Sequence, residues 1–102
     1  MTLESWLRDR TPPPPRRLAE RIGEVLGERA ARPATEAHEL CLEAAVELLG
    51  DVYCRPGGRE SALDLLTVDA LVTYAFEASA SEPAKLHERA RSAMTRLSLV
   101  PQ

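Results

Sequence analysis

Apolar side chains recur along this chain at helical spacing, and in one stretch they surround most of the helix. Residues 61–81 read SALDLLTVDALVTYAFEASAS, in which only a narrow strip formed by Asp69, Thr73 and Glu77 is polar. A helix that is apolar around most of its circumference has to be covered on most sides. We therefore predict that a helix over 60–80 lies at the centre of the fold and that the other segments wrap around it.

The clearest one-sided pattern lies over 35–54. Apolar residues recur there three or four positions apart, from Ala37 to Val52, which is the spacing of an amphipathic helix. We expect Thr35 to cap its first turn. The opposite side is an acidic ridge made of Glu36, Glu39, Glu43, Glu47 and Asp51. This acidic ridge is a candidate docking surface, either for basic partners or for the arginine-rich helices of the chain itself.

Two further helices are predicted before and after this pair. Residues 15–31 and 82–98 each carry a single apolar stripe, and Ser81 is positioned to cap the last helix. The sequence Arg-Pro-Gly-Gly at 55–58 predicts a tight turn, so the helices on either side of it should be antiparallel neighbours. We therefore predict an all-α fold, a small four-helix bundle.

An additional short helix is predicted at the N-terminus, joined to the bundle by a proline-rich spacer. Thr2 is its N-cap. The prolines at 12–15 end the helix, because proline has no N–H to donate, and they favour a stiff polyproline II segment. We divide the chain into an arm with its spacer over 1–14 and a helical domain over 15–102. The arm is a candidate interaction element that either folds back or reaches another subunit, and its apolar side chains are Leu3, Trp6 and Leu7.

Composition and charge limit the classes of function. The chain has 102 residues, of which 44% are hydrophobic and 4% aromatic, so one small domain with a core of Leu, Ala and Val is expected. Basic and acidic residues number seven and five over 1–34, two and ten over 35–82, and four and one over 83–102, for a net charge of −3. We expect no nucleic-acid binding, which needs a clustered basic face, and no membrane span, which needs about 20 apolar residues in a row.

The two cysteines do not indicate a disulfide framework, and the chain begins with a charged amphipathic stretch rather than the apolar run of a secretory signal. We therefore expect the reducing cytoplasm. Two histidines and the two cysteines form a candidate tetrahedral zinc site, whose members are His38, Cys41, Cys54 and His87. Their spacing differs from the close ligand pairs of structural zinc sites, and a small buried core residue is favoured for Cys41. No metal or cofactor is predicted.

Two residues are candidates for acid-base or nucleophilic chemistry. Asp64 either completes a capping box with Ser61 or is a buried carboxyl whose pKa is raised by desolvation. Cys54, beside a predicted turn and an arginine, is a candidate exposed thiol of lowered pKa. The sequence contains neither a glycine-rich nucleotide loop nor the pattern of a catalytic triad, so we do not expect an enzyme.

One stretch of the predicted central helix resembles a known family. LLTVDALVTYAFEA, from Leu65 to Ala78, is similar to a structural helix of the trans-prenyl diphosphate synthases. The aspartate-rich motifs that bind magnesium and diphosphate in that family have no counterpart in this chain, so the resemblance implies no shared activity.

The sequence favours a small non-catalytic interaction or adaptor protein. Because three amphipathic helices can hardly enclose a fourth that is apolar all round, we expect self-association into a homodimer. The expected contacts with a protein partner are the three apolar residues of the arm or the acidic ridge. The expected dimer interface is the central helix or the arm that carries Trp6. The alternative is a small-molecule-binding bundle with a cavity around helix 61–80, lined by Asp64, Tyr74 and Phe76.

Overall fold

The computed structural model describes residues 1–55, 57, 59–80 and 83–100, which form helices and no β-strand. The predicted all-α class is therefore confirmed. Within those ranges, no helix combines the length and the hydrophobicity that crossing a lipid bilayer requires. The elements are α1 (Leu3–Arg8), α2 (Arg16–Leu26), the 3-10 helices η1 (Gly27–Ala31) and η2 (Ala34–Glu36), α3 (Ala37–Tyr53), α4 (Arg59–Ser79) and α5 (Pro83–Ser98).

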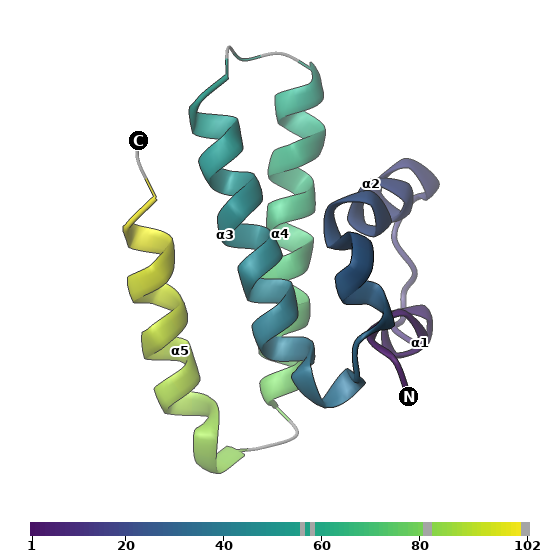
Figure 1. The fold of residues 1–102 in the computed structure, drawn as a ribbon, viewed down its shortest axis with the longest axis vertical. Helices are drawn as coiled ribbons and strands as arrows, with labels where there is room; N and C mark the ends of the chain where they lie inside the picture. The colour runs from purple at the N-terminus through teal and green to yellow at the C-terminus, as the bar shows by residue number, and fades with distance from the viewer. Residues whose placement is uncertain (56, 58, 81–82, 101–102) are drawn as a thin grey trace.

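Helices α3 and α4 lie side by side as an antiparallel pair and share the most extensive contacts in the fold (Figure 1). The antiparallel arrangement was predicted, although the turn that motivated it includes residues 56 and 58, which lie outside the described residues. Helix α5 runs along one side of the pair, and α1 and α2 lie on the other side. The radius of gyration, 13.3 Å, is that of a compact chain of this length.

Helices α3 and α4 together form the centre of the fold, because each contacts the other and both contact α2 and α5. The prediction placed the helix at 60–80 there alone, but α3 is the more completely buried of the two. On α4, by contrast, the side chains of Leu65 and Leu66 are 48% and 57% exposed. Small side chains on several sides of α3 allow its neighbours to approach closely. Nine of its 17 residues are buried, namely Ala37, His38, Leu40, Cys41, Leu42, Ala44, Ala45, Leu48 and Val52.

The buried stripe of α4 contains polar side chains that a purely apolar pattern leaves out. Asp64, Thr67 and Ser79 are at most 2% exposed. A buried hydroxyl has to be hydrogen-bonded to avoid a cost of about 1–3 kcal/mol, and Thr67 Oγ1 donates to the carbonyl of Leu63 at 2.9 Å. The buried face of α4 therefore differs from the face that the positions of its leucines alone would predict.

Gly27 ends α2 earlier than we predicted. We expected a continuous helix to residue 31, with this glycine inside it. Instead Gly27 has a φ of 53°, in the left-handed region that glycine adopts at little cost, and the 3-10 helix η1 follows. The resulting change of direction carries the chain from α2 towards the start of α3.

The structure describes three of the four predicted helix caps, and one of the three is present. Thr2 caps α1, because its side-chain oxygen accepts a hydrogen bond from the Ser5 amide at 3.2 Å. Thr35 does not cap α3, which begins two residues later after a 3-10 turn, and Ser61 lies inside α4, which begins two residues earlier. The cap predicted at Ser81 lies outside the described residues.

Candidate functional site

The N-terminal segment is attached to its own chain by backbone hydrogen bonds. The amide of Leu3 donates to the carbonyl of Arg32 at 2.8 Å, and the amide of Ala34 donates to the carbonyl of Met1 at 2.9 Å. The Leu3 side chain is 0% exposed and belongs to the core, and Trp6 and Leu7 pack against that core while remaining partly exposed. This attachment fixes α1 and the proline segment opposite α2.

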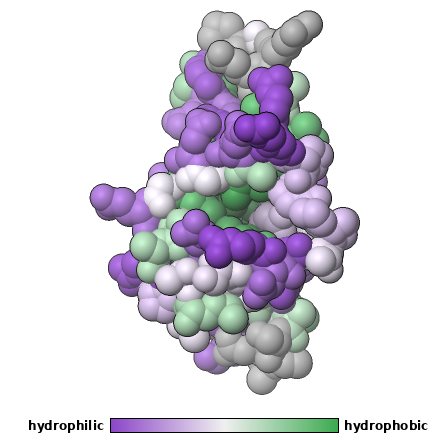
Figure 2. All heavy atoms as spheres, turned by 90° about the vertical axis from the view of Figure 1, so that its right-hand side faces the viewer, coloured by the Kyte–Doolittle hydropathy of each residue, from purple (hydrophilic) through white to green (hydrophobic). Residues whose placement is uncertain are grey.

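A groove of about 520 Å³ lies between the α1–proline segment and α2. On the face of the molecule that carries α1 and α2, Figure 2 shows a hollow with apolar side chains between hydrophilic ones. Its apolar lining includes Leu7, Pro13, Pro14, Ile22 and Leu26. Its polar lining is formed by Glu4, Arg8, Arg10 and Tyr74. An apolar hollow with a few polar groups is the usual composition of a ligand site.

Arg10 has the most unusual surroundings of these polar residues. Its guanidinium carbon lies 4.3 Å from the centre of the Trp6 ring, a cation–π contact. Its Nη1 lies 3.9 Å from Glu77 Oε2, which is too long for a hydrogen bond. Its Nε is buried and has no hydrogen-bond partner among the described residues. A buried N–H without an acceptor costs about 1–3 kcal/mol, so the hydrogen-bonding capacity of the Arg10 guanidinium is incompletely used within the described residues.

Tyr74 brings α4 into the groove. Its ring meets the Trp6 ring edge to face, with centroids 6.3 Å apart and an interplanar angle of 84°. Burial, together with the nearby charge of Glu77, raises the pKa of the Tyr74 hydroxyl. The hydroxyl is therefore neutral at neutral pH and can donate a hydrogen bond. The groove thus combines an apolar surface with a guanidinium and a hydroxyl.

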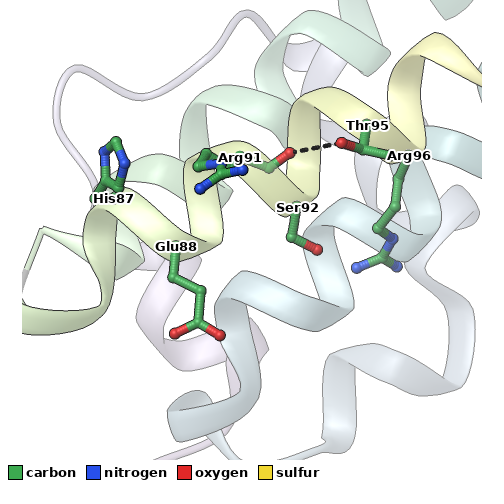
Figure 3. Close-up of a pocket in the computed structure, with 6 residues that line it drawn as sticks. All are labelled: His87, Glu88, Arg91, Ser92, Thr95 and Arg96. Atoms are coloured by element: carbon green, nitrogen blue, oxygen red, sulfur yellow. Dashed lines mark hydrogen bonds between the residues drawn. The ribbon is translucent and has the colours of Figure 1, made fainter.

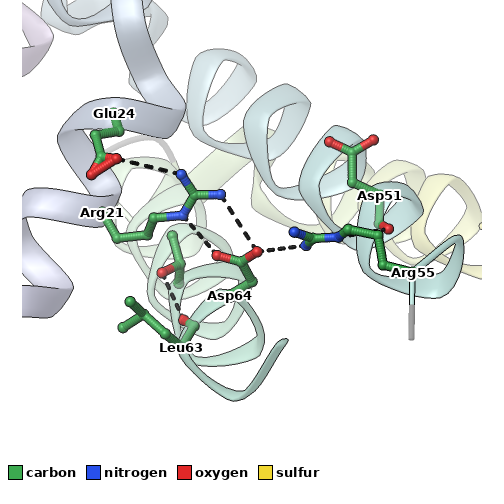
Figure 4. Close-up of polar contacts among 7 residues, drawn as sticks. Arg21, Glu24, Asp51, Arg55, Leu63 and Asp64 are labelled. Atoms are coloured by element: carbon green, nitrogen blue, oxygen red, sulfur yellow. Dashed lines mark hydrogen bonds and ion pairs between the residues drawn. The ribbon is translucent and has the colours of Figure 1, made fainter. Parts of the chain in front are cut away.

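Asp64 lies in a separate cluster that joins α2, α4 and Arg55, which lies just beyond the end of α3 (Figure 4). Its side chain is 3% exposed and accepts hydrogen bonds from Arg21 Nε at 2.7 Å and from Arg55 Nη2 at 2.5 Å. Burial alone would raise the pKa of the Asp64 carboxyl, but the two guanidinium groups outweigh it and hold the pKa below its usual value. Both interpretations of Asp64, a helix cap and a carboxyl of raised pKa, are therefore wrong.

His38 and Ser79 form a buried polar pair between α3 and α4. His38 Nδ1 lies 2.7 Å from Ser79 Oγ and 2.9 Å from the carbonyl oxygen of Ala75. The Phe76 ring packs near the imidazole, with centroids 6.5 Å apart. A serine beside a histidine is the arrangement of an activated nucleophile, but Ser79 is 0% exposed and its hydroxyl is out of reach of a substrate. The pair links the two helices.

The structure does not bring the four candidate zinc ligands together. Cys41 is buried in α3 and Cys54 is exposed just after it, about 20 Å away along the helix axis. His87 is exposed on α5, in a shallow cleft whose lining residues all come from that one helix (Figure 3). Among the described residues, no three of the His, Cys, Asp and Glu side chains are grouped so that they could hold a metal ion.

Arginines of the same chain meet the acidic ridge. Arg32 Nη2 lies 2.7 Å from Glu36, and Arg96 of α5 lies 3.0 Å from Glu39. Arg29 of η1 pairs with both Glu43 and Glu47. Exposed ion pairs contribute only about 0–1 kcal/mol each, so these contacts neutralise the ridge more than they stabilise the fold. The ridge was a candidate docking surface either for basic partners or for the arginine-rich helices of this chain. The contacts in the structure are of the second kind.

The three residues predicted to line one cavity lie in different places. Tyr74 lines the groove, Asp64 lies in the arginine cluster, and Phe76 packs beside the His38 imidazole. Sequence reasoning missed Arg10 and the α2 side of the groove. The only signal in the sequence is that Arg10 lies between the helix that carries Trp6 and the four prolines. This position indicates that the Arg10 side chain is constrained, but it does not predict which residues contact it.

Comparisons with known proteins do not assign this site. No protein family, no curated protein and no solved structure matches the chain. The chemistry of the groove is therefore the basis on which a function can be argued.

Proposed function

We propose that this chain is a non-catalytic binding protein whose site is the groove between the α1–proline segment and α2, and that its ligand is a small molecule with an apolar body. The observation that carries the proposal is the size and lining of the groove. Its volume, about 520 Å³, lies within the range of about 300–1,000 Å³ that is usual for ligand sites. Leu7, Ile22 and Leu26 offer apolar surface there, and Arg10 and Tyr74 offer hydrogen-bond donors.

In this proposal the four longer helices act as a bundle that supports the site. Pro13 and Pro14 act as a stiff wall of the groove, because proline restricts the backbone before any ligand arrives. A preformed wall lowers the entropy that binding would otherwise cost. The burial of Leu3 supports this role, since it anchors the helix from which the wall extends.

We propose a non-catalytic protein because the reactive side chains lie away from the groove. Cys41 and Ser79 are 0% exposed, and Asp64 is paired with two arginines. Cys54 is exposed but does not line the groove. A nucleophile or a general base has to come within hydrogen-bond reach of the reacting atoms, and none of these four side chains lines the groove.

Gly23 offers a direct test of the groove. It lies in α2 on the groove lining, and a Cβ added there would meet no atom within 4 Å. Gly23→Phe therefore fills the groove without a clash at Cβ. Glu20→Phe adds the same ring to an exposed position of α2 outside the groove and is the matched control.

The measurement is the fluorescence of Nile red, a neutral apolar dye, titrated with each protein. We expect the wild type and Glu20→Phe to bind the dye with equal affinity, and Gly23→Phe to lose most of that binding. Thermal unfolding followed by circular dichroism checks that all three proteins are folded. Equal binding by Gly23→Phe would place the dye elsewhere and would contradict the proposal.

Self-association into a homodimer is a second candidate, favoured by the adjacent exposed side chains of Leu65 and Leu66 on α4. A two-fold axis would bring this strip of one copy against the same strip of its partner, so that both leucines lose water contact. Sedimentation velocity at micromolar concentration tests it. We expect a dimer that dissociates in Leu66→Glu, whereas a monomeric wild type would end this candidate.

A further inference from the structure

The Arg10 guanidinium is held in place on one side and lacks an acceptor on another. The centre of the Trp6 ring lies 4.3 Å from its central carbon, a cation–π contact that restrains the group. The carboxylate of Glu77 forms an ion pair with Nη1 only, at 3.9 Å. The buried Nε has no partner in the described part of the chain. A planar donor group with this much of its capacity unused is suited to a planar acceptor.

The charges around the groove indicate how much negative charge it can accept. Two cations, Arg8 and Arg10, and one anion, Glu4, line it. Arg8 pairs with Glu4 at 3.3 Å on an exposed part of α1, so these two charges offset each other. Arg10 remains, with only the long contact to Glu77. Because this ion pair is long, Arg10 can accept one further negative charge, while a dianion would also be repelled by the two glutamates, Glu4 and Glu77.

We propose that the groove binds an amphipathic monocarboxylate, with its carboxylate on the Arg10 guanidinium and its apolar chain against Leu7, Ile22 and Leu26. The proposal rests on the proposed function and specifies the chemistry of its ligand. A carboxylate is planar and accepts two parallel N–H bonds from an arginine, which its two terminal Nη atoms can donate. The apolar floor beyond it buries the rest of the ligand.

Three probes with the same apolar chain and different heads test the head group. Octanoate is an anion, 1-octanol is neutral and octylamine is a cation at neutral pH. Each is titrated calorimetrically, the two ions below their critical micelle concentrations and 1-octanol below its solubility limit. We expect octanoate to bind about 10- to 100-fold more tightly than 1-octanol, which is the effect of a hydrogen bond to a charged group. Octylamine should bind most weakly of the three. Equal affinities for octanoate and 1-octanol would overturn the carboxylate proposal.

Two variants locate the effect. Arg10→Gln removes the proposed anchor, and Arg16→Gln removes an exposed cation of α2 that does not line the groove. We expect Arg10→Gln to lower octanoate affinity about 10- to 100-fold with little change for 1-octanol, and Arg16→Gln to change either by less than about threefold. Equal losses in both variants would mean a general effect of charge and would contradict an Arg10 anchor. Thermal unfolding of Arg10→Gln verifies that it remains folded.

The combined results separate this inference from the proposed function. Binding of Nile red and 1-octanol without any preference for octanoate would leave the groove as a ligand site and reject the carboxylate. Failure of the wild type to bind Nile red, 1-octanol and octanoate alike would reject the groove as a ligand site, and the carboxylate proposal with it.

Discussion

Arg21 and Asp64 are 43 residues apart in the sequence, yet Arg21 Nε lies 2.7 Å from Asp64 Oδ1. Arg55 approaches the same carboxylate from just beyond the end of α3, so one buried acid connects three parts of the chain. Removing one member of a buried ion pair leaves the others uncompensated, which costs more than the pair itself contributes. The stability of the fold should therefore depend strongly on Asp64.

The first prediction is that Asp64→Asn lowers the free energy of unfolding by about 1–3 kcal/mol. The change leaves Arg21 and Arg55 facing each other without the negative charge between them, although both remain partly exposed to water. Urea unfolding measures it. Asp69→Asn, on an exposed position of the same helix, is the control and should change stability by less than about 0.5 kcal/mol. Equal effects in the two variants would contradict the role of the cluster.

The second prediction concerns acid. The pKa of Asp64 is lowered in the folded protein, so the unfolded chain takes up a proton at this residue first, near its ordinary pKa of about 3.9. The stabilisation from Asp64 is therefore complete above that pH and is lost as the pH falls through the folded-state pKa. Urea unfolding at a series of pH values should show the difference between the wild type and Asp64→Asn shrinking on acidification. A difference that stays constant would show that the carboxyl is not shifted.

The third prediction is that the two cysteines differ in reactivity. Burial raises the pKa of the Cys41 thiol to about 12, so this residue is protonated as well as inaccessible at neutral pH, whereas Cys54 is exposed. Titration of the native protein with a chromogenic disulfide reagent should detect one thiol rapidly. Cys54→Ser should show no reaction until urea is added. Rapid labelling of native Cys54→Ser would mean that α3 opens far more readily than its burial indicates.

The fourth prediction uses two glycines of the same region. Gly23 lies within α2 and Gly27 ends it with a φ of 53°, and at both positions an added Cβ would meet no atom within 4 Å. The backbone alone therefore decides the outcome. Gly23→Ala should stabilise the protein by about 0.5–1 kcal/mol, and Gly27→Ala should destabilise it by about 1–3 kcal/mol. Thermal unfolding measures both, with shifts of opposite sign; a stabilising Gly27→Ala would mean that α2 continues beyond Leu26.

Local patterns in the sequence predicted the helices because each is encoded by neighbours a few residues apart. The stripe of α3 and the cap at Thr2 are of this kind, and both agree with the structure. The prediction that α4 is covered on most sides failed because the apolar pattern counted Leu65 and Leu66 as buried, whereas both are exposed and the acid Asp64 is buried. Contacts between distant segments reverse that assignment, since Arg21 allows the acid to be buried while the two leucines remain partly exposed.

The candidate site could not be predicted for a related reason. The sequence indicates Trp6 as a residue of the arm and Tyr74 as a cavity residue. Their edge-to-face contact, however, depends on how α1 packs against α4. The groove also needs the proline segment to lie opposite α2, and this follows from backbone hydrogen bonds between the first residues and 32–34. The periodicity of side chains along the sequence does not predict backbone hydrogen bonds of this kind.

Those hydrogen bonds close the first third of the chain into a ring, because Thr2 and Pro33 pair across its base. Both walls of the groove belong to this ring, so α1 cannot swing away from α2 as an independent lid without also breaking the contacts of Leu3. The ring should open as one cooperative unit, and the amides of Leu3 and Ala34 should exchange their hydrogens with deuterium at matching rates. A bound ligand would then slow both amides together and protect the groove and the N-terminus in the same measure.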